Sequence, residues 1–160
     1  MPVRRYRFIL LASTATLALL AAGVRDALAQ QVALSNIRGL DFGRFVAGSG
    51  GSVVVTPAGV RSRTGAVVLL NSPSAGQAAL NVSRFSGKKT DTIISLPANG
   101  SIRLTSGANT MAVNSFVSSP AFTMSIATPA TLSIGATLTV APNQAPGTYS
   151  GTFPVTVNYQ

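Results

Sequence analysis

The chain has 160 residues, and only 9% of them are charged: twelve Lys or Arg against three Asp or Glu, a net charge of +9. It contains no His and no Cys. Disulfide bonds are therefore excluded, as are the Ser-His-Asp and Cys-His arrangements that activate nucleophiles and the zinc sites that use His or Cys. So few acids also exclude a calcium site built from clustered carboxylates.

Residues 1–29 have the features of a cleavable signal peptide. A start with three arginines (Arg4, Arg5 and Arg7) precedes an apolar stretch over residues 8–22. That stretch is shorter than the ~20 residues a helix needs to cross a membrane. Ala27 and Ala29 form the small-x-small pattern that signal peptidase cleaves, so we expect Gln30 to be the first exported residue. An uncleaved signal anchor is the alternative.

The exported part, residues 30–160, keeps eight basic and two acidic side chains, a net charge of +6. A chain of this length is expected to form one domain and to bury a hydrophobic core without the help of disulfide bonds. We expect a secreted protein, in the periplasm or at the bacterial cell surface, with no stable transmembrane anchor after cleavage. The general secretory route is favoured, because Arg7 stands where a twin-arginine signal would have its phenylalanine.

The first expected element of the exported part contains Val32 and Leu34, which alternate with small or polar residues. It is either the first strand of the domain itself or a strand donated to a neighbouring chain by β-augmentation. The residues available for either role are few, because only residues 30–38 precede the sequence that begins at Leu40.

Further strands are predicted in chain order by short alternating runs: Ala78-Leu80-Val82, Ile94-Leu96, Ile102-Leu104, Met111-Val113, Phe122-Met124-Ile126 and Leu138-Val140. Such alternation is typical of strands with one buried and one wet face. Asn99-Gly100, between the second and third of these runs, predicts a tight hairpin or a slightly longer loop. No exported segment of ten or more residues has an apolar stripe at helical spacing.

The last strand is predicted over residues 149–159, where Phe153, Val155, Val157 and Tyr159 alternate with polar residues. Pro154 has no N–H, which means that this strand lies at a sheet edge or is locally irregular. Gly147 and Tyr149 resemble a tyrosine corner, in which the tyrosine hydroxyl bonds to backbone a few residues upstream. Together the patterns predict an immunoglobulin-like antiparallel β-sandwich of about nine or ten short strands, with a small β-barrel as the alternative.

Several motifs together resemble one bacterial secreted family. They are Leu40-Asp41-Phe42-Gly43, Val53-Val54-Val55-Thr56-Pro57-Ala58-Gly59, Ile94-Ser95-Leu96-Pro97, Met111-Ala112-Val113, Gly135-Ala136-Thr137-Leu138-Thr139-Val140 and Gly147-Thr148-Tyr149-Ser150-Gly151-Thr152-Phe153. This pattern resembles the family called domain of unknown function 4402 over essentially the whole exported chain. The resemblance implies an organisation similar to pilin and fimbrial subunits. Pro154 departs from the family pattern, which would more naturally have Thr there.

The remaining charged residues suggest surface roles. Asp41 and Asp91 are the only acids of the exported part, and we interpret them as a turn residue and a solvated residue. We therefore expect no enzyme, metal or cofactor. Arg61 and Arg63 share a face if extended, and Lys88 and Lys89 cluster near Arg84, so these cations are either a solvated surface or a contact for anionic glycan. Binding of nucleic acid is not expected.

The function predicted is that of an exported structural or adhesive cell-surface protein, a pilin-like subunit or a component of a surface appendage. Its partners would be itself or related subunits, joined by β-strand addition. The alternative is a monomeric secreted module that binds anionic glycan or cell envelope through basic loops, and an enzyme is a remote third.

Overall fold

The structure is a computed structural model that describes residues 32–84, 90–121, 123–126 and 129–159. These residues form no helix. They form twelve strands: β1 (Val32–Arg38), β2 (Phe45–Val46), β3 (Gly51–Val55), β4 (Arg61–Gly65), β5 (Val68–Leu69), β6 (Ala78–Arg84), β7 (Thr90–Ser95), β8 (Ile102–Ser106), β9 (Asn109–Ser119), β10 (Thr123–Ile126), β11 (Ala130–Val140) and β12 (Thr156–Tyr159). The prediction of an all-β antiparallel fold is confirmed.

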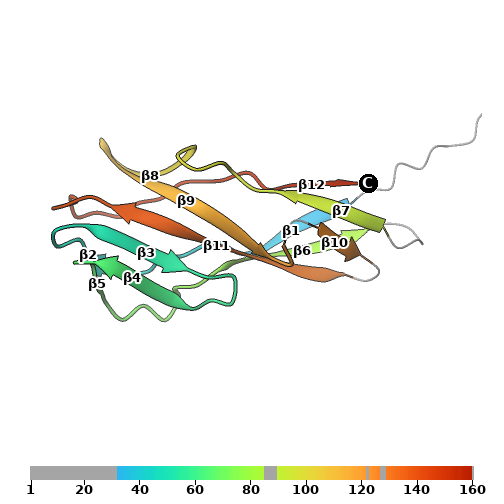
Figure 1. Ribbon diagram of the computed structural model, residues 1–160, viewed down its shortest axis with the longest axis horizontal. Helices are drawn as coiled ribbons and strands as arrows, with labels where there is room; N and C mark the ends of the chain where they lie inside the picture. Colours follow the sequence, from blue (N-terminus) through green and yellow to red (C-terminus); the bar gives the residue numbers. More distant parts are fainter. Residues whose placement is uncertain (1–31, 85–89, 122, 127–128, 160) are drawn as a thin grey trace, which may run out of the picture.

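The long strand β11 is the spine of a seven-stranded sheet and runs lengthwise through an elongated molecule (Figure 1). Its first half pairs with β6, which in turn pairs with β1. Its second half pairs with β3, which pairs with β4. Along its other side β11 pairs with β9, which forms a hairpin with β8. The edge strands β1 and β4 therefore lie at opposite ends of the molecule.

Gly135 marks the place where β11 changes partner from β6 to β3. A Cβ atom built on this residue would lie 2.2 Å from the carbonyl oxygen of Val55, at the end of β3. Real Cβ atoms do not approach a carbonyl oxygen so closely, so only glycine lets the end of β3 reach the spine here. On either side of Gly135, every even-numbered residue from Leu132 to Val140 is buried, as strand alternation requires.

The apolar interior consists of two cores, one at each end of the spine. The β3 core contains Phe42, Val53, Val55, Val67, Met111, Val113, Ala136, Leu138 and Val140. The β6 core contains Ala78, Val82, Ile94, Leu132 and Ile134. Leu40 and Phe116 pack against both cores and connect them.

A different layer covers each core. Over the β6 core lies a three-stranded sheet in the order β10-β7-β12, whose central strand contributes the buried Ile94. This end of the molecule is thus a two-layered sandwich. At the other end the short pair β2–β5 contributes Phe45 and Leu69 to the β3 core.

The predicted hairpin at Asn99-Gly100 is wrong. β7 pairs with β10 and β12, whereas β8 pairs with β9, so the Asn99-Gly100 loop passes from one sheet to the other. The tight hairpin is instead the β8–β9 turn, where Gly107 has a φ of 58°. Glycine adopts such a positive φ without steric cost, as a two-residue hairpin turn requires.

The predicted last strand is only partly correct. A ladder forms over Thr156–Tyr159, which pairs with β7, and a single bridge joins Ser150 to Thr105 of β8. Residues 151–155 are not part of a strand. The physical reason is that their neighbouring chain is interrupted between β7 and β8, so no continuous strand lies beside them, and Pro154 has no N–H to donate.

Candidate functional site

The first strand, β1, lies at the open edge of the large sheet. It pairs with β6 of the same chain from Val32↔Arg84 onward, and the register shifts between Asn36 and Arg38. Val32 is the only apolar side chain of β1 that packs against a core. The side chain of Leu34 is 38% exposed and that of Ile37 is 59% exposed. The segment predicted as a donor or first strand is therefore an intramolecular edge strand with few buried side chains.

The chain is held firmly just after β1, at Asp41. The backbone N–H of Asp41 donates to the carbonyl of Gly76 at 2.9 Å, and the N–H of Gly76 donates to the carbonyl of Asp41 at 2.8 Å. The Asp41 carboxylate accepts from the N–H of Gly43 at 2.7 Å and from the hydroxyl of Ser74 at 2.8 Å. Asp41 thus has the turn-forming role expected of it, because its carboxylate organises the loop that follows.

A long groove separates this first part of the chain from the last part. Its narrow end is a cleft of about 270 Å³ between residues 36–42 and residues 151–155. Its wide end, of about 1100 Å³, lies between residues 40–48 and residues 143–151. The two ends share four lining residues: Leu40, Phe42, Leu104 and Gly151. They therefore form one continuous feature, which we call the long groove.

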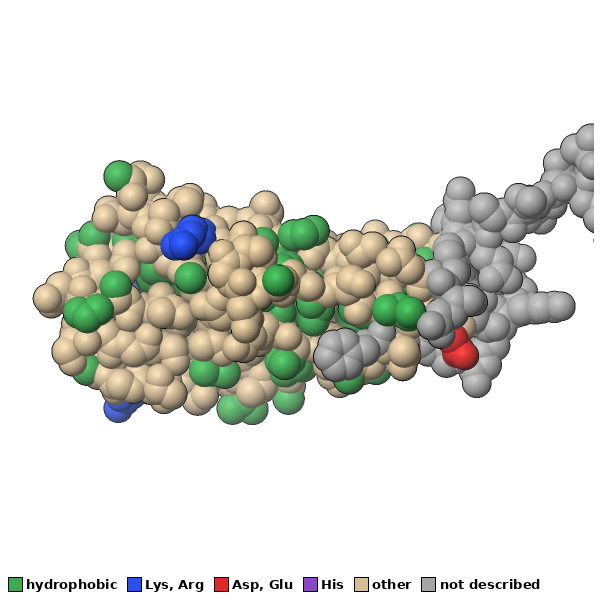
Figure 2. Space-filling view, turned by 45° about the horizontal axis from the view of Figure 1, so that its top comes forward, with side chains coloured by type: hydrophobic (Ala, Val, Ile, Leu, Met, Phe, Trp, Pro, Cys, Tyr) green, Lys and Arg blue, Asp and Glu red, His purple; other side chains and the backbone are tan. Residues whose placement is uncertain are grey.

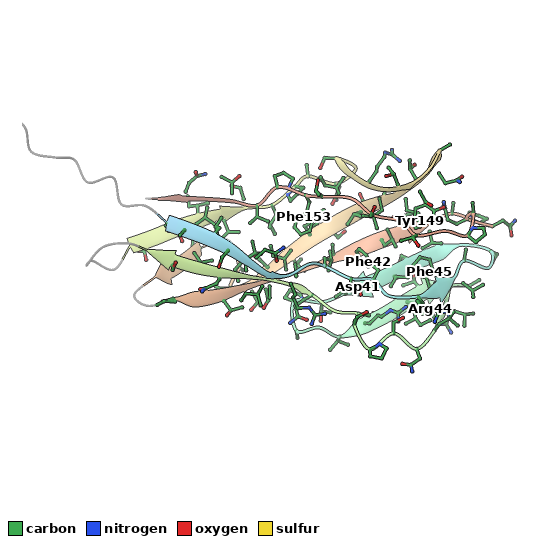
Figure 3. All side chains as sticks on the ribbon, turned by 180° about the vertical axis from the view of Figure 1, so that it is seen from behind. Asp41, Phe42, Arg44, Phe45, Tyr149 and Phe153 are labelled. Carbon is green, nitrogen blue, oxygen red and sulfur yellow. The ribbon has the colours of Figure 1, made fainter. Side chains whose placement is uncertain are left out.

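Figure 3 shows the two walls of the long groove facing each other, with Asp41, Phe42, Arg44 and Phe45 on one side and Tyr149 and Phe153 on the other. Its floor is formed by apolar residues of β6, β8, β9 and β11: Ala78, Leu80, Ile102, Leu104, Met111, Val113 and Leu138. An apolar floor between two extended chain segments has the shape and chemistry that suit a further extended segment.

Residues 151–155 give one wall of the groove an unpaired backbone. No backbone hydrogen bond joins them to any other described residue. Their side chains nevertheless alternate as a strand would, because Phe153 and Val155 are half-buried against the β6 core while Thr152 and Pro154 are exposed. The segment is thus extended, with one half-buried and one exposed side, but it is not paired with any described strand.

Tyr149, at the start of this wall, has the geometry of a tyrosine corner. Its hydroxyl donates to the carbonyl of Ala145 at 2.7 Å and lies 2.8 Å from Nε2 of Gln144, which donates to it. Nearby Gly147 has a φ of 158°, and a Cβ atom there would lie 2.5 Å from the hydroxyl oxygen of Ser106. The two hydrogen bonds fix the conformation of the loop before the wall, and the glycine at position 147 lets that loop lie close to Ser106 of β8.

Arg61, which we considered as an anion contact, has its guanidinium committed within the chain. Nη1 donates to the carbonyl of Leu70 at 3.0 Å, and Nη2 donates to the carbonyl of Arg44. Burial lowers the pKa of Arg61 below its ordinary value, although the nearby Asp41 carboxylate opposes that effect. Arg61 therefore stabilises the contact between β4 and two loops and is not a free surface cation.

Arg63 stands two residues from Arg61 on the extended strand β4 and shares its face, as predicted for an extended segment. Arg63 is exposed and donates to the carbonyl of Gly65 in its own strand, at 3.1 Å. Lys88 and Lys89 lie outside the described residues, as do Ala27, Ala29 and Gln30 of the expected cleavage site. Figure 2 shows a face on which charged side chains are sparse.

The described residues offer little other chemistry. Asp91 is exposed on β7, far along the chain from Asp41. The part of the chain that the structure describes holds no group of three or more His, Cys, Asp or Glu side chains that could bind a metal ion. Within that same part, no helix is long and apolar enough to cross a membrane.

Sequence reasoning missed the long groove and the role of Arg61. Neither has a local signal, because each depends on contacts between segments that are distant in the chain. The alternation from Leu132 to Val140 could have predicted the whole of β11, whereas we recognised only its end at Leu138 and Val140.

Comparison with known proteins gives a family but no relative with an assigned role. No curated protein and no solved structure matches the chain. A family model described as "Domain of unknown function (DUF4402)" matches residues 32–159, which include all twelve strands. The chain therefore belongs to the DUF4402 family.

Proposed function

We propose that this protein is an exported structural subunit of a cell-surface assembly, pilin-like in its organisation, and that its subunits are joined by β-strand pairing. The observation that carries the proposal is the open side of the molecule. There, the outer edge of β1 and the unpaired residues 151–155 flank a groove with an apolar floor. Open strand edges invite pairing with another chain, and a protein that retains one must either protect it or use it.

The chemistry of the chain supports a structural role over a catalytic one. Its two exported acids are far apart in sequence, and Asp41 is committed to its own loop. Of the two cations that line the groove, Arg38 donates to the carbonyl of Ser74 and Arg44 is exposed on one wall. Arg61, which donates to the carbonyl of Arg44, is committed to backbone carbonyls. Apart from Arg38, Asp41 and Arg44, the groove presents backbone and apolar or uncharged polar side chains, which favours recognition of an extended polypeptide.

The test uses lysines, which suppress strand pairing when they stand on an edge. Purified exported protein is compared with the variant Asn36→Lys, Thr152→Lys, whose new charges stand on the two rims of the narrow cleft. The matched control is Ser62→Lys, Thr64→Lys on the edge strand β4. Mass is measured by light scattering, and filaments are sought by electron microscopy of cell-surface material.

We expect the unaltered protein and the β4 control to assemble, and the groove variant to remain monomeric. The proposal would be contradicted if the unaltered protein stayed monomeric at high concentration under conditions that permit assembly. Monomers that bind an acidic glycan column and are released by salt would favour the glycan-binding module instead.

A further inference from the structure

We propose that β1 is the strand exchanged between subunits: β1 of one molecule leaves its own β6 and pairs with β6 of a second copy. This inference rests on the proposed function, and it adds the identity of the strand, its acceptor and its partner. It is carried by three features of the structure, namely the weak attachment of β1, the free space at Gly39 and the firm anchor at Asp41.

β1 is attached to the rest of the domain mainly by its ladder to β6. Five of its seven residues are exposed, and its only apolar contact with a core comes from Val32 at its start. The register shift between Asn36 and Arg38 also interrupts the ladder near its end, and it leaves the side chain of Ile37 exposed. A segment with so few buried contacts opens at a lower free energy than the strands of the core.

Gly39 provides a hinge at the end of β1. A Cβ atom built there would meet nothing within 4 Å, so the space beside this residue is open. One contact must be broken for the hinge to turn, because Nη2 of Arg38 donates to the carbonyl of Ser74 at 2.8 Å. This bond is exposed to water, which replaces it at small cost.

The anchor at Asp41 limits how far the chain can peel away. Its paired backbone hydrogen bonds with Gly76 and its carboxylate bonds to Gly43 and Ser74 hold the loop in place. Phe42, which follows, is buried in the β3 core. Release of β1 would therefore stop at Gly39 and Leu40 and withdraw only Val32 from the β6 core.

The vacated β6 edge is the best acceptor for a second β1. Leu34 stands opposite Val82 and Asn36 opposite Leu80, so the departing strand uncovers side chains that the same strand in another copy covers again. An exchange of identical elements restores every native contact and costs little beyond association. Because donor and acceptor are different surfaces of each subunit, exchange can close into a ring or dimer, or continue as a filament.

The natural absence of cysteine makes the exchange directly measurable. Ser35 and Asn81 are cross-strand partners in the β1–β6 ladder. Two single variants, Ser35→Cys and Asn81→Cys, are mixed under assembly conditions and oxidised. We expect a mixed disulfide between the two chains, because neither chain alone contains a cysteine pair and the residues meet only if β1 has changed molecules.

The double variant Ser35→Cys, Asn81→Cys, oxidised as a dilute monomer, locks β1 onto its own β6. We expect this lock to abolish assembly and reduction to restore it. The control lock Ser52→Cys, Thr64→Cys joins β3 to β4, where the two hydroxyls lie 2.7 Å apart, and is expected to leave assembly unchanged.

The outcomes separate this inference from the proposed function. Assembly that persists in the locked β1 variant overturns the exchange of β1 while subunit assembly stands. A mixed disulfide of Ser35→Cys with Thr152→Cys, in place of Asn81→Cys, shows that the strand enters the long groove and overturns β6 as its acceptor. An unaltered protein that never assembles overturns both.

Discussion

The two edge strands of the large sheet, β4 and β1, differ in how their outer edges are protected. β4 stands beside β5, and its Arg61 lies opposite the buried Val55, with the guanidinium bonded to the carbonyls of Leu70 and Arg44. A charged side chain on the core-facing side of an edge strand is a known protection against pairing with other chains. β1 has a comparable cation only at its last residue, where Arg38 donates to the carbonyl of Ser74 through a bond exposed to water, and five of its seven residues are exposed.

The two ends of the large sheet thus protect their edges to different degrees. One end of the spine has an edge strand with a core-facing arginine bonded to two loops, and the other has an edge strand with few buried side chains beside the narrow end of the groove. The following predictions test this contrast, beginning with the strand on which both edges depend.

The largest effect is expected for Gly135→Ala, at the junction between the β6 and β3 halves of the spine. The added Cβ atom would stand 2.2 Å from the carbonyl oxygen of Val55, so β3 must move away and lose its register with β11. We expect the free energy of unfolding, measured with urea, to fall by more than ~3 kcal/mol. Gly39→Ala is the control, because its Cβ atom meets nothing within 4 Å. Equal losses in the two variants would contradict the crowding at Gly135.

Arg61→Met should remove the charged side chain that protects the edge of β4. The variant loses two hydrogen bonds from a charged donor and leaves the carbonyl of Leu70 without that partner, at an expected cost of about 1–3 kcal/mol in the free energy of unfolding. We also expect faster aggregation, followed by light scattering. The control Arg63→Met, whose side chain is exposed on the same strand, should change stability by less than ~0.5 kcal/mol. If both variants behave alike, Arg61 does not protect the edge.

Tyr149→Phe should loosen the wall of the groove that faces the first part of the chain. It removes the hydroxyl that donates to the carbonyl of Ala145 and accepts from Gln144. The expected loss of stability is about 1–1.5 kcal/mol in urea denaturation. Thr148→Ala, at a neighbouring exposed residue, serves as the control and should be nearly neutral. A neutral Tyr149→Phe would mean that the corner contributes nothing to the stability of this wall.

The smallest loss in the free energy of unfolding is expected for a substitution on β1 itself. Leu34→Ala should cost less than ~1 kcal/mol, because the side chain is already 38% exposed. Its cross-strand partner provides the matched comparison: Val82, at 1% exposure, should cost about 2 kcal/mol when changed to Ala. A loss at Leu34 as large as that at Val82 would show that β1 is an integral part of the core and would remove the contrast between the two edges.

Strand positions were predictable wherever alternation was strong and local. The runs at Ala78-Leu80-Val82, Ile102-Leu104 and Met111-Val113 lie in β6, β8 and β9. The hairpin prediction at Asn99-Gly100 was wrong because a turn dipeptide indicates where a chain bends. It does not indicate which strands pair across the bend. The last strand was predicted too long because alternation reports which side chains are buried, whereas a ladder also needs a neighbouring strand.

The all-β class follows from the amino-acid sequence alone, as does the exclusion of the nucleophile arrangements and zinc sites that need His or Cys, because alternation and residue content are local properties of the chain. Only the tertiary structure shows which sheet edge is protected by an arginine. The same holds for the unpaired backbone and for the position of the groove. Each depends on segments that meet from distant parts of the chain, as Arg61 meets Arg44 and Leu70, and as the two walls of the groove come from its first and last segments. No local sequence pattern predicts these contacts between distant segments, because they follow from the packing of the whole sheet.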